Sequence, residues 1–213
     1  MINRIIFCDF DGTITAEETF VGMLRQFATQ SYNDIKNRIL NRQISLRDGV
    51  RSLVESIPSE RYSEVLSYVR TKPIRKGFSS LLDLCRQHQI PFVVISGGLL
   101  DSVKTRLSAY ADKITSIHAA SVDTTGPFLK LISEYESDEE LVSKPKVTKI
   151  YTYDESAVIG DGITDVSLVQ TATVVFARDL LAQYLDTKKR PYATWRDFRD
   201  IRISLQARWQ LPL

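Results

Sequence analysis

The sequence predicts an α/β protein with a mainly parallel β-sheet. Four short apolar runs have the length and composition of buried strands, and stretches with helical period lie between them. Three of these runs end directly in polar or glycine-rich turns, at the edge where open α/β sheets bind ligands. After a turn at residues 123–127, residues 128–132 are expected to add an antiparallel strand. The four apolar runs are residues 5–8, 92–95, 157–159 and 174–176.

The first run ends in two aspartates, Asp9 and Asp11, spaced i, i+2. Side chains two apart on an extended chain point the same way, so both carboxylates are expected to reach into one pocket. Gly12 then allows the backbone to turn sharply. Two carboxylates this close repel each other, and one tends to be protonated unless a cation lies between them. The pattern suits one nucleophile, one acid–base group and one metal ion.

A long stretch, roughly residues 16–74, separates the first two strands. A crossover between parallel strands needs only about a dozen residues, so this stretch must carry additional structure. Its apolar residues repeat with helical spacing, and Ser45 and Ser59 are expected to be helix N-caps. We therefore predict a small helical bundle inserted after the first strand. The helical spacing is found at residues 20–27, 46–54 and 62–69.

The second run leads into Ser96, Gly97 and Gly98, and a helix is expected to follow. Backbone N–H groups at the start of a helix form an anion site when no side chain covers them. The Ser96 hydroxyl can then add a hydrogen bond to a phosphate oxygen. Taken alone, the same residues are also typical of an ordinary strand-to-helix turn with serine as the N-cap.

Two further motifs carry charged groups. Lys144 precedes Pro145, which fits the first turn of a helix, and a lysine there can reach a phosphate as a point charge. Alone, a surface lysine is the commoner explanation, and Lys146 is an alternative phosphate ligand. Asp161 ends the third run and Asp165 follows four residues later; oxygen ligands of this kind suit Mg²⁺. Alone, Asp165 is equally typical of an acidic residue at a helix N-terminus.

The order and context of these motifs agree: acid pair, hydroxyl turn, lysine and acid pair each lie after or beside a predicted strand. The chain resembles the haloacid dehalogenase (HAD) superfamily, in its phosphoserine phosphatase-like branch, from residue 5 to about residue 180. The resemblance implies a Rossmann-like HAD core, residues 1–15 and 75–213, with an inserted helical cap of C1 type, residues 16–74. It is carried by Asp9-Phe10-Asp11-Gly12-Thr13, Ser96, Lys144 and Gly160-Asp161-Gly162-Ile163-Thr164-Asp165.

This resemblance implies a phosphomonoesterase that works through an aspartyl-phosphate, and the chemistry of the two leading aspartates agrees with it. Asp9 is expected to attack phosphorus as an ionised carboxylate. Asp11 is expected to protonate the leaving alkoxide and then to deprotonate the water that hydrolyses the intermediate. A dehalogenase has no alkoxide to protonate and would not need Asp11.

The resemblance also implies a Mg²⁺ ion as the cofactor. We expect Asp9, Asp161 and the backbone carbonyl of Asp11 to bind the metal, with Asp165 as close support. Positive charge and hydrogen-bond donors are expected to neutralise the phosphoryl oxygens. The expected phosphate-binding residues are Ser96, Gly97 and Lys144.

The cap is expected to choose the substrate, a small phosphorylated metabolite. Glu18 would suit an amino group and Phe20 a thioether, although Phe20 is also typical of the cap's own core. Several segments are similar to members of this branch that act on 2-hydroxy-3-keto-5-methylthiopentenyl 1-phosphate in methionine salvage, so this substrate is expected ahead of phosphoserine. A phosphomutase of the same superfamily and a non-catalytic phosphometabolite-binding module are the alternatives. The similar segments are residues 8–15, 90–98, 144–145 and 176–179.

The composition, with 43% hydrophobic and 25% charged residues, is ordinary for a globular protein. The formal net charge of +2 is too small to indicate nucleic acid or a membrane surface as a partner. Cys8 and Cys85 lie in apolar contexts and are expected to be buried free thiols. No apolar stretch approaches the ~20 residues of a membrane span, and no signal peptide is expected, so the sequence predicts a cytoplasmic protein.

Overall fold

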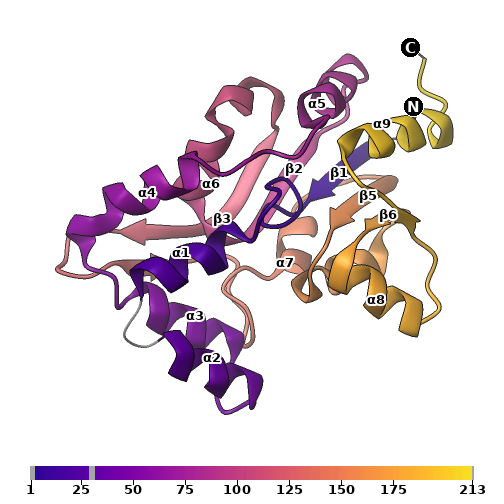
Figure 1. Cartoon of the computed structure of the whole chain (residues 1–213). Coiled ribbons are helices and arrows are strands. Elements are labelled where there is room, and N and C mark those ends of the chain that lie inside the picture. Colours follow the sequence, from indigo (N-terminus) through magenta and orange to yellow (C-terminus); the bar gives the residue numbers. More distant parts are fainter. Residues whose placement is uncertain (1–2, 29–31, 213) are drawn as a thin grey trace.

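The computed structural model describes residues 3–28 and 32–212, and within them a seven-stranded sheet forms the centre of the molecule (Figure 1). The strand order is β4-β3-β2-β1-β5-β6-β7, and all neighbouring strands are parallel except β3 and β4. The predicted α/β class with a mainly parallel sheet is therefore confirmed. The strands are β1 (Arg4–Cys8), β2 (Phe92–Leu99), β3 (Ser116–Asp123), β4 (Lys130–Ile132), β5 (Glu155–Gly160), β6 (Val174–Ala177) and β7 (Ala193–Thr194).

Helices cover both faces of this sheet because alternate strand residues are apolar on both sides. In β1, Ile6 and Cys8 belong to a core formed with three helices, α5 (Phe78–Gln87), α6 (Leu100–Leu107) and α9 (Phe198–Arg208). Ile5 and Phe7 belong to a second core on the opposite face, formed with α7 (Lys144–Thr148), α8 (Asp179–Thr187) and the inserted helices. Both cysteines are buried and unpaired, as predicted.

Four α-helices and a short 3₁₀ helix lie between β1 and α5 in the described part of the chain. In Figure 1, α1 to α3 extend from the lower left of the sheet, and α4 lies beside α6. The two segments that connect these inserted helices to the sheet region are hydrogen-bonded to each other. There the Ala16 N–H donates to the Pro73 carbonyl, and the Arg75 N–H donates to the Ile14 carbonyl. The inserted elements are α1 (Thr19–Phe27), α2 (Tyr32–Leu40), α3 (Leu46–Val54), η1 (Ser59–Arg61) and α4 (Tyr62–Arg70).

One of the two predicted N-caps is confirmed and the other is wrong. The Ser45 hydroxyl accepts a hydrogen bond from the Asp48 N–H at 3.0 Å and caps α3. Ser59 instead lies inside the 3₁₀ helix η1, and its hydroxyl is buried without a hydrogen-bond partner among the described residues. The physical reason is tertiary: the Ser59 N–H donates to the Pro127 carbonyl, which holds this turn against the loop between β3 and β4.

The sheet differs from the prediction mainly at β2 and β3. The second strand continues past Ile95 to Leu99, with an irregular register against β3 between these residues. The sequence analysis missed β3, in which only Ala120 is buried, so no apolar run marks it. The antiparallel strand expected at residues 128–132 is shorter and occupies only β4.

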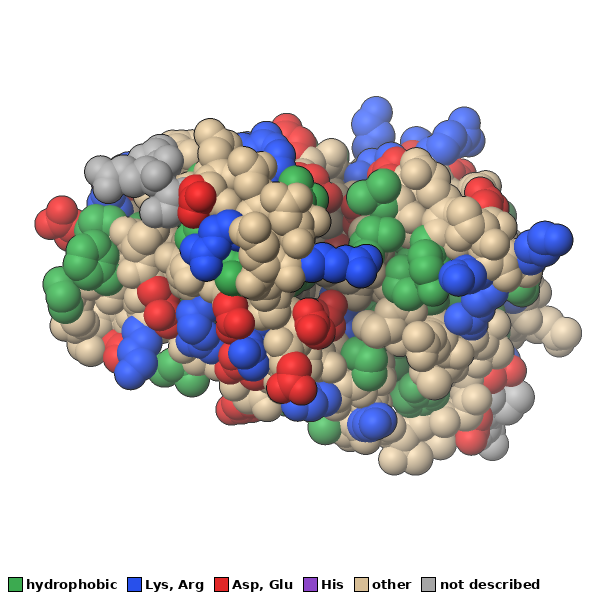
Figure 2. Space-filling view, turned by 90° about the horizontal axis from the view of Figure 1, so that it is seen from below, with side chains coloured by type: hydrophobic (Ala, Val, Ile, Leu, Met, Phe, Trp, Pro, Cys, Tyr) green, Lys and Arg blue, Asp and Glu red, His purple; other side chains and the backbone are tan. Residues whose placement is uncertain are grey.

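Acidic and basic side chains intermingle on the face shown in Figure 2, as the small net charge suggests. No helix in the described residues is both long and apolar enough to cross a membrane.

Candidate active site

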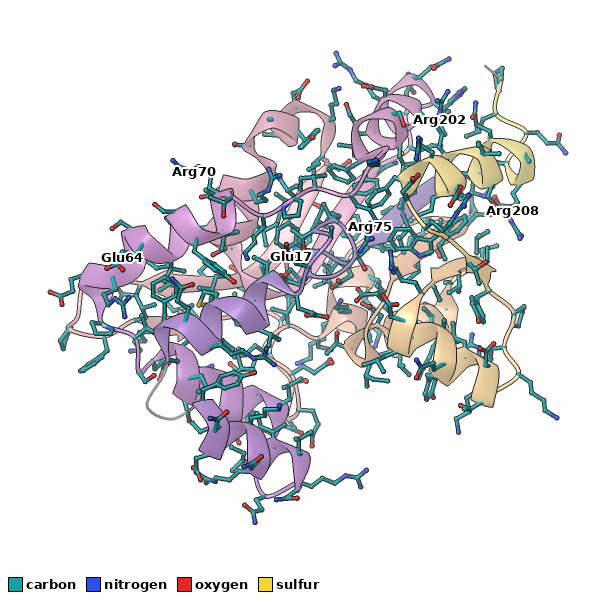
Figure 3. The ribbon with its side chains drawn as sticks, viewed as in Figure 1. Glu17, Glu64, Arg70, Arg75, Arg202 and Arg208 are labelled. Carbon is teal, nitrogen blue, oxygen red and sulfur yellow. The ribbon has the colours of Figure 1, made fainter. Side chains whose placement is uncertain are left out.

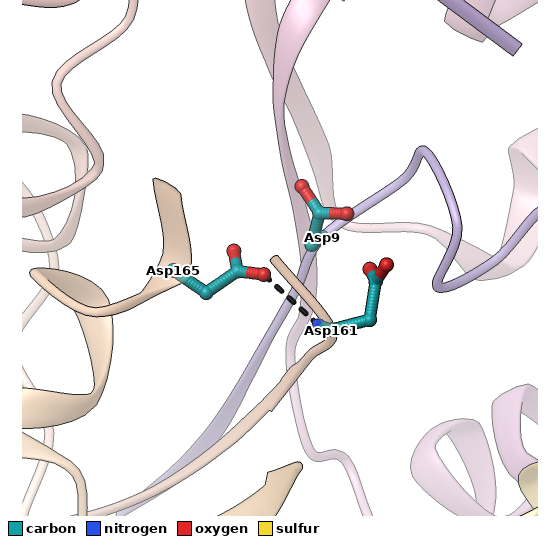
Figure 4. A group of neighbouring side chains, drawn as sticks. All are labelled: Asp9, Asp161 and Asp165. Atoms are coloured by element: carbon teal, nitrogen blue, oxygen red, sulfur yellow. Dashed lines mark hydrogen bonds between the residues drawn. The ribbon is translucent and has the colours of Figure 1, made fainter. Parts of the chain in front are cut away.

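Three buried aspartates meet at the carboxyl ends of β1 and β5 (Figure 4). The register pairs Cys8 with Ile159, so Asp9 and Asp161 follow directly from two neighbouring strands. One carboxylate oxygen from each of Asp9, Asp161 and Asp165 lies within 4.8 Å of the others. Asp165 is fixed by its own loop, because its Oδ2 accepts hydrogen bonds from the N–H groups of Asp161 and Gly162, each at 3.0 Å.

Lys144 brings a positive charge into this cluster. Its side chain is 1% exposed, and its Nζ lies 2.5 Å from both Asp9 Oδ1 and Asp165 Oδ1. Pro145 stands in the first turn of α7, as expected, and this turn directs Lys144 into the sheet edge. Lys146 is exposed instead, and its ammonium group donates to the Glu136 carbonyl. The geometry thus distinguishes the two lysines that the sequence left as alternatives.

Burial and charge govern ionisation in the cluster. Burial raises the pKa of Asp161 to about 6, with a hydrogen bond from Thr13 opposing the rise and Asp165 adding to it. Burial also raises the pKa of Asp9, while Lys144 opposes that rise. Burial alone would lower the pKa of Lys144, but attraction to Asp165 and Asp9 holds it above its ordinary value. Lys144 therefore stays charged, and a further cation would relieve the remaining repulsion among the carboxylates.

Asp11 stands apart from the three clustered carboxylates. Its Oδ1 accepts the Phe20 N–H at 2.9 Å, and its Oδ2 accepts the Ser96 hydroxyl at 3.4 Å. Burial raises the pKa of Asp11 to about 7, a rise that the Phe20 N–H opposes and Glu18 reinforces. A carboxyl group with a pKa near neutrality can both give and take a proton at physiological pH.

Ser96 is buried beside Asp11, and Gly97 is exposed to the cavity next to it. The expected helix follows these residues, but Ser96 is not its N-cap. Strand β2 continues through both glycines, and α6 begins only at Leu100. The Ser96 hydroxyl accepts the Gly98 N–H at 3.0 Å, so this local bond, rather than a helix turn, orients the hydroxyl.

The loop after Asp9 packs directly against Asp161. Gly12 has a φ of 78°, and a Cβ at this position would lie 2.3 Å from Asp161 Oδ2, so only glycine fits here without a shift. The Thr13 hydroxyl donates to Asp161 Oδ1 at 2.5 Å. Sequence reasoning gave Thr13 no role of its own. Its place directly after Gly12 in the first motif was the signal that could have found it.

A cavity of about 200 Å³ opens over these groups, between the core and the insert. Glu18 and Phe20, the two candidate specificity residues, both line it together with Asp9 and Asp11. Glu18 is exposed at its rim, and burial and repulsion from Asp165 raise the pKa of its carboxyl group. The remaining lining residues are Val21, Leu24, Leu46, Val50, Gly97, Gly98, Asp161, Gly162, Thr164 and Asp165.

Several of these lining residues were not predicted as part of a site. Leu46 and Val50 lie one turn apart on α3, and Leu24 lies on α1. In the sequence they were recognised only as apolar positions of inserted helices. Helical spacing shows that a face is buried, but not whether it faces a helix or a cavity, so this part of the wall could not be assigned.

The donor set of the cluster suits a hard divalent cation. Asp9, Asp161 and Asp165 offer only carboxylate oxygens, and neither histidine nor thiol groups are among them. Oxygen-only ligands favour Mg²⁺, Mn²⁺ or Ca²⁺ over zinc or copper. The elevated pKa of Asp161 is consistent with a site that a bound cation would complete.

Comparison with known proteins places this arrangement in a family. A family model for haloacid dehalogenase-like hydrolases matches residues 6–170. The chain belongs to the haloacid dehalogenase-like hydrolase family. A relative from Microcystis aeruginosa, named 2-hydroxy-3-keto-5-methylthiopentenyl-1-phosphate phosphatase, is 42% identical over 209 residues, 97% of this chain and 100% of the relative. A relative of the same name from Bacillus mycoides (strain KBAB4) is 30% identical, covering 94% of this chain and 95% of the relative.

Solved structures with the same fold include phosphoserine phosphatases. One, a phospho-aspartyl intermediate analogue of phosphoserine phosphatase, has a TM-score of 0.68 at 18% identity and covers 94% of this chain and 98% of its own. A substrate-bound phosphoserine phosphatase complex has a TM-score of 0.69 at 17% identity and covers 94% and 97%. At this identity the likeness establishes the HAD fold. Family membership and the phosphatase relatives together make this chain a HAD phosphatase, as the motifs predicted.

Proposed function

We propose that this HAD phosphatase hydrolyses 2-hydroxy-3-keto-5-methylthiopentenyl 1-phosphate in a Mg²⁺-dependent reaction. The full-length similarity to phosphatases of that name supports the proposal. The observation on which it mainly rests is the composition of the cavity wall. This wall combines the buried carboxylates with apolar side chains from α1 and α3, Leu24, Leu46 and Val50. An apolar wall beside a phosphate site fits a leaving group with a methylthio chain.

The same lining disfavours phosphoserine as the substrate. Phosphoserine carries a carboxylate beside its amino group, and buried carboxylates are normally bound by arginine or lysine. Of the described residues that line the cavity, none is lysine or arginine. Lys144, the cation that contacts the lining residues Asp9 and Asp165, is already paired with both carboxylates. Glu18 at the rim would repel a substrate carboxylate further.

In the proposed reaction, Asp9 is the nucleophile. A carboxylate oxygen of Asp9 forms a bond to phosphorus while the bond from phosphorus to the substrate oxygen breaks, and the electron pair leaves with that oxygen. Lys144 supports this role because its ammonium group contacts Asp9 Oδ1 and favours the ionised carboxylate, which opposes the rise in the pKa of Asp9 that burial causes. The product of this step is an acyl phosphate on Asp9.

Asp11 is the proposed acid–base group. Its pKa of about 7 supports proton transfer to the departing oxygen in the first step. The ionised Asp11 then takes a proton from a water molecule as that water attacks phosphorus and regenerates Asp9. Hydrogen bonds from the Phe20 N–H and the Ser96 hydroxyl orient the Asp11 carboxyl group for both transfers.

The proposed metal-binding residues are Asp9, Asp161 and Asp165, with the Asp11 carbonyl. When bound, Mg²⁺ would neutralise charge on the phosphoryl oxygens and reduce the repulsion between phosphate and carboxylates. The Ser96 hydroxyl, the exposed Gly97 backbone and Lys144 are the proposed phosphate contacts. Residues 16–74 are proposed to act as a cap over the core, residues 1–15 and 75–213, and to exclude water during the reaction.

Phosphate release from a substrate panel tests the proposal. We expect kcat/KM for the methylthiopentenyl phosphate to exceed that for phosphoserine by roughly 100-fold or more, since an unpaired buried carboxylate costs about 3 kcal/mol. Activity should disappear in EDTA and return with Mg²⁺. Preference for phosphoserine would overturn the substrate assignment. A single turnover followed by transfer to a sugar would indicate a phosphomutase, and binding without phosphate release would indicate a non-catalytic module.

A further inference from the structure

We propose that Arg75 is a positioning residue that holds the loop between Asp9 and Asp161 in its reactive shape. The inference rests on the proposed function, because it assigns to that same site a supporting side chain from outside the HAD motifs. Arg75 is half-buried at the base of the insert and was not predicted from the sequence. Figure 3 shows its position beside the loop that follows β1.

The side chain of Arg75 binds the loop through two backbone carbonyl groups. Its Nη2 donates to the Gly12 carbonyl at 2.6 Å, and its Nε donates to the Thr13 carbonyl at 3.1 Å. These are the peptide groups that follow Asp11. Because a peptide unit is planar, fixing a carbonyl oxygen also fixes the orientation of the next N–H group. Arg75 therefore sets the orientation of two successive peptide planes, Gly12–Thr13 and Thr13–Ile14, which begin one residue after the proposed acid–base residue.

Thr13 carries this constraint to the proposed metal site. Its carbonyl is bound by Arg75, and its hydroxyl donates to Asp161 Oδ1 at 2.5 Å. The loop at Gly12 lies so close to the same carboxylate that a Cβ at this position would be 2.3 Å from Asp161 Oδ2. A shift of the loop would therefore rotate the Asp161 carboxylate or leave it without its hydrogen bond. Ligand carboxylates fixed by outer hydrogen bonds bind metal more tightly than free ones.

Trp195 holds the guanidinium group of Arg75 in place from the other side. The guanidinium carbon lies 5.4 Å from the centre of the indole ring, within cation–π range. Trp195 is 5% exposed, so it forms a rigid surface. Arg178 lies near the same ring at 5.2 Å, but its own N–H groups bind Asp179 and the Arg196 carbonyl, away from the loop. Arg178 thus shares the aromatic contact without the loop contact.

The backbone of Arg75 connects the same loop to the insert. Its N–H donates to the Ile14 carbonyl at 2.9 Å, and the neighbouring Ile74 pairs with Thr15 in an isolated bridge. The side chain and the backbone of one residue therefore hold both the loop and the returning end of the insert. If the returning end of the insert moved, Arg75 would transmit that movement to Gly12 and Thr13.

The variants Arg75→Met and Arg75→Lys test the proposal, with Arg178→Met as the matched control. In R75M we expect kcat for p-nitrophenyl phosphate to fall ~10–100-fold with little change in KM, because misplacement of reacting groups acts on the chemical step. The Mg²⁺ concentration that gives half of the Mg²⁺-induced rise in Tm should increase about tenfold without any substrate present. R75K, which keeps the charge but has one donor nitrogen in place of the two that bind the loop, should recover part of both losses, and R178M should behave as wild type.

The outcomes separate this proposal from the proposed function. Wild-type kcat and Mg²⁺ response in R75M would overturn the positioning role, as would equal losses in R178M, which would indicate general packing on Trp195. If R75M does not fold, R75K decides: an unchanged kcat and Mg²⁺ response would overturn the role. An inactive wild-type protein would contradict the proposed function, while the Mg²⁺-induced rise in Tm would still report on Arg75.

Discussion

Replacing Lys144 with methionine should strongly destabilise the protein when no divalent cation is present. The side chain is 1% exposed and lies 2.5 Å from two carboxylates, Asp9 and Asp165. Methionine has a similar length but no charge, so the variant keeps most of the volume and removes the cation. Three carboxylates with ligand atoms within 4.8 Å of one another would then share one buried site without a counter-charge.

The expected magnitude follows from the burial of this group. Removing one partner of a buried ion pair costs about 3–5 kcal/mol, because the remaining charge is left unpaired. For a chain of 150–250 residues, each kcal/mol lowers Tm by about 2–4 °C, so K144M should melt roughly 6–20 °C below wild type. Thermal unfolding followed by circular dichroism at pH 7.5 in EDTA measures this difference.

The pH dependence of the variant gives a second check, with a defined sign. Without Lys144, the folded-state pKa of Asp9 lies still further above its unfolded-state value, since burial and repulsion from Asp165 and Asp161 favour the protonated form. The folded state then binds more protons than the unfolded state, and stability falls as pH rises. The Tm deficit of K144M should therefore be smaller at pH 5 than at pH 8.

Lys146→Met is the matched control for this experiment. Lys146 lies two residues away on the same short helix and is exposed, and among the described hydrogen bonds its side chain makes only the one to the Glu136 carbonyl. K146M should melt within about 2 °C of wild type, as surface substitutions usually do. A K144M variant that melts as close to wild type as K146M does, in EDTA, would refute the electrostatic account of the cluster.

Three further predictions concern other parts of the molecule. Asp9→Asn should lower kcat by roughly 10⁴-fold or more without loss of helical signal, because an amide forms no acyl phosphate; near-wild-type turnover would mean that the nucleophile is another residue. Ser45→Ala should cost about 1 kcal/mol, measured by urea unfolding, because the α3 cap bond is lost. Phe20→Ala should reduce kcat/KM for the methylthiopentenyl phosphate ~10-fold more than for p-nitrophenyl phosphate, since only the former has a chain to pack on the cavity wall.

The parts of the fold that the sequence predicted are those with continuous apolar runs. Strands β1, β5 and β6 are buried nearly throughout, so a short apolar segment marks each of them. Strand β3 is half-exposed along most of its length, so no apolar run marks it in the sequence. Its place in the sheet is set by its pairing with β2 and β4. The extension of β2 through Gly97 and Gly98 also depends on a partner strand, which local propensity cannot reveal.

The candidate site divides in a similar way. The sequence placed Asp9, Asp161, Asp165 and Lys144 near one another, because strand ends in a parallel sheet meet at one edge. Arg75 has no comparable signal, since its partners are backbone carbonyl groups, which every residue carries. The apolar cavity wall was equally hidden, because the spacing of apolar residues on α3 does not say what that face contacts. The roles assigned to the individual site residues stay predictions until they are tested by substitution.

Trapping of the covalent intermediate tests the central claim most directly. Asp11→Asn should react normally with p-nitrophenyl phosphate in the first step, because nitrophenolate leaves without protonation, and slowly in the second, because no base activates water. After mixing with Mg²⁺ and this ester and quenching in acid, mass spectrometry should find one phosphoryl group on the D11N protein, on the peptide that contains Asp9. Absence of the adduct, or an adduct that persists when Asp9 is also replaced by asparagine, would contradict an aspartyl-phosphate mechanism at this site.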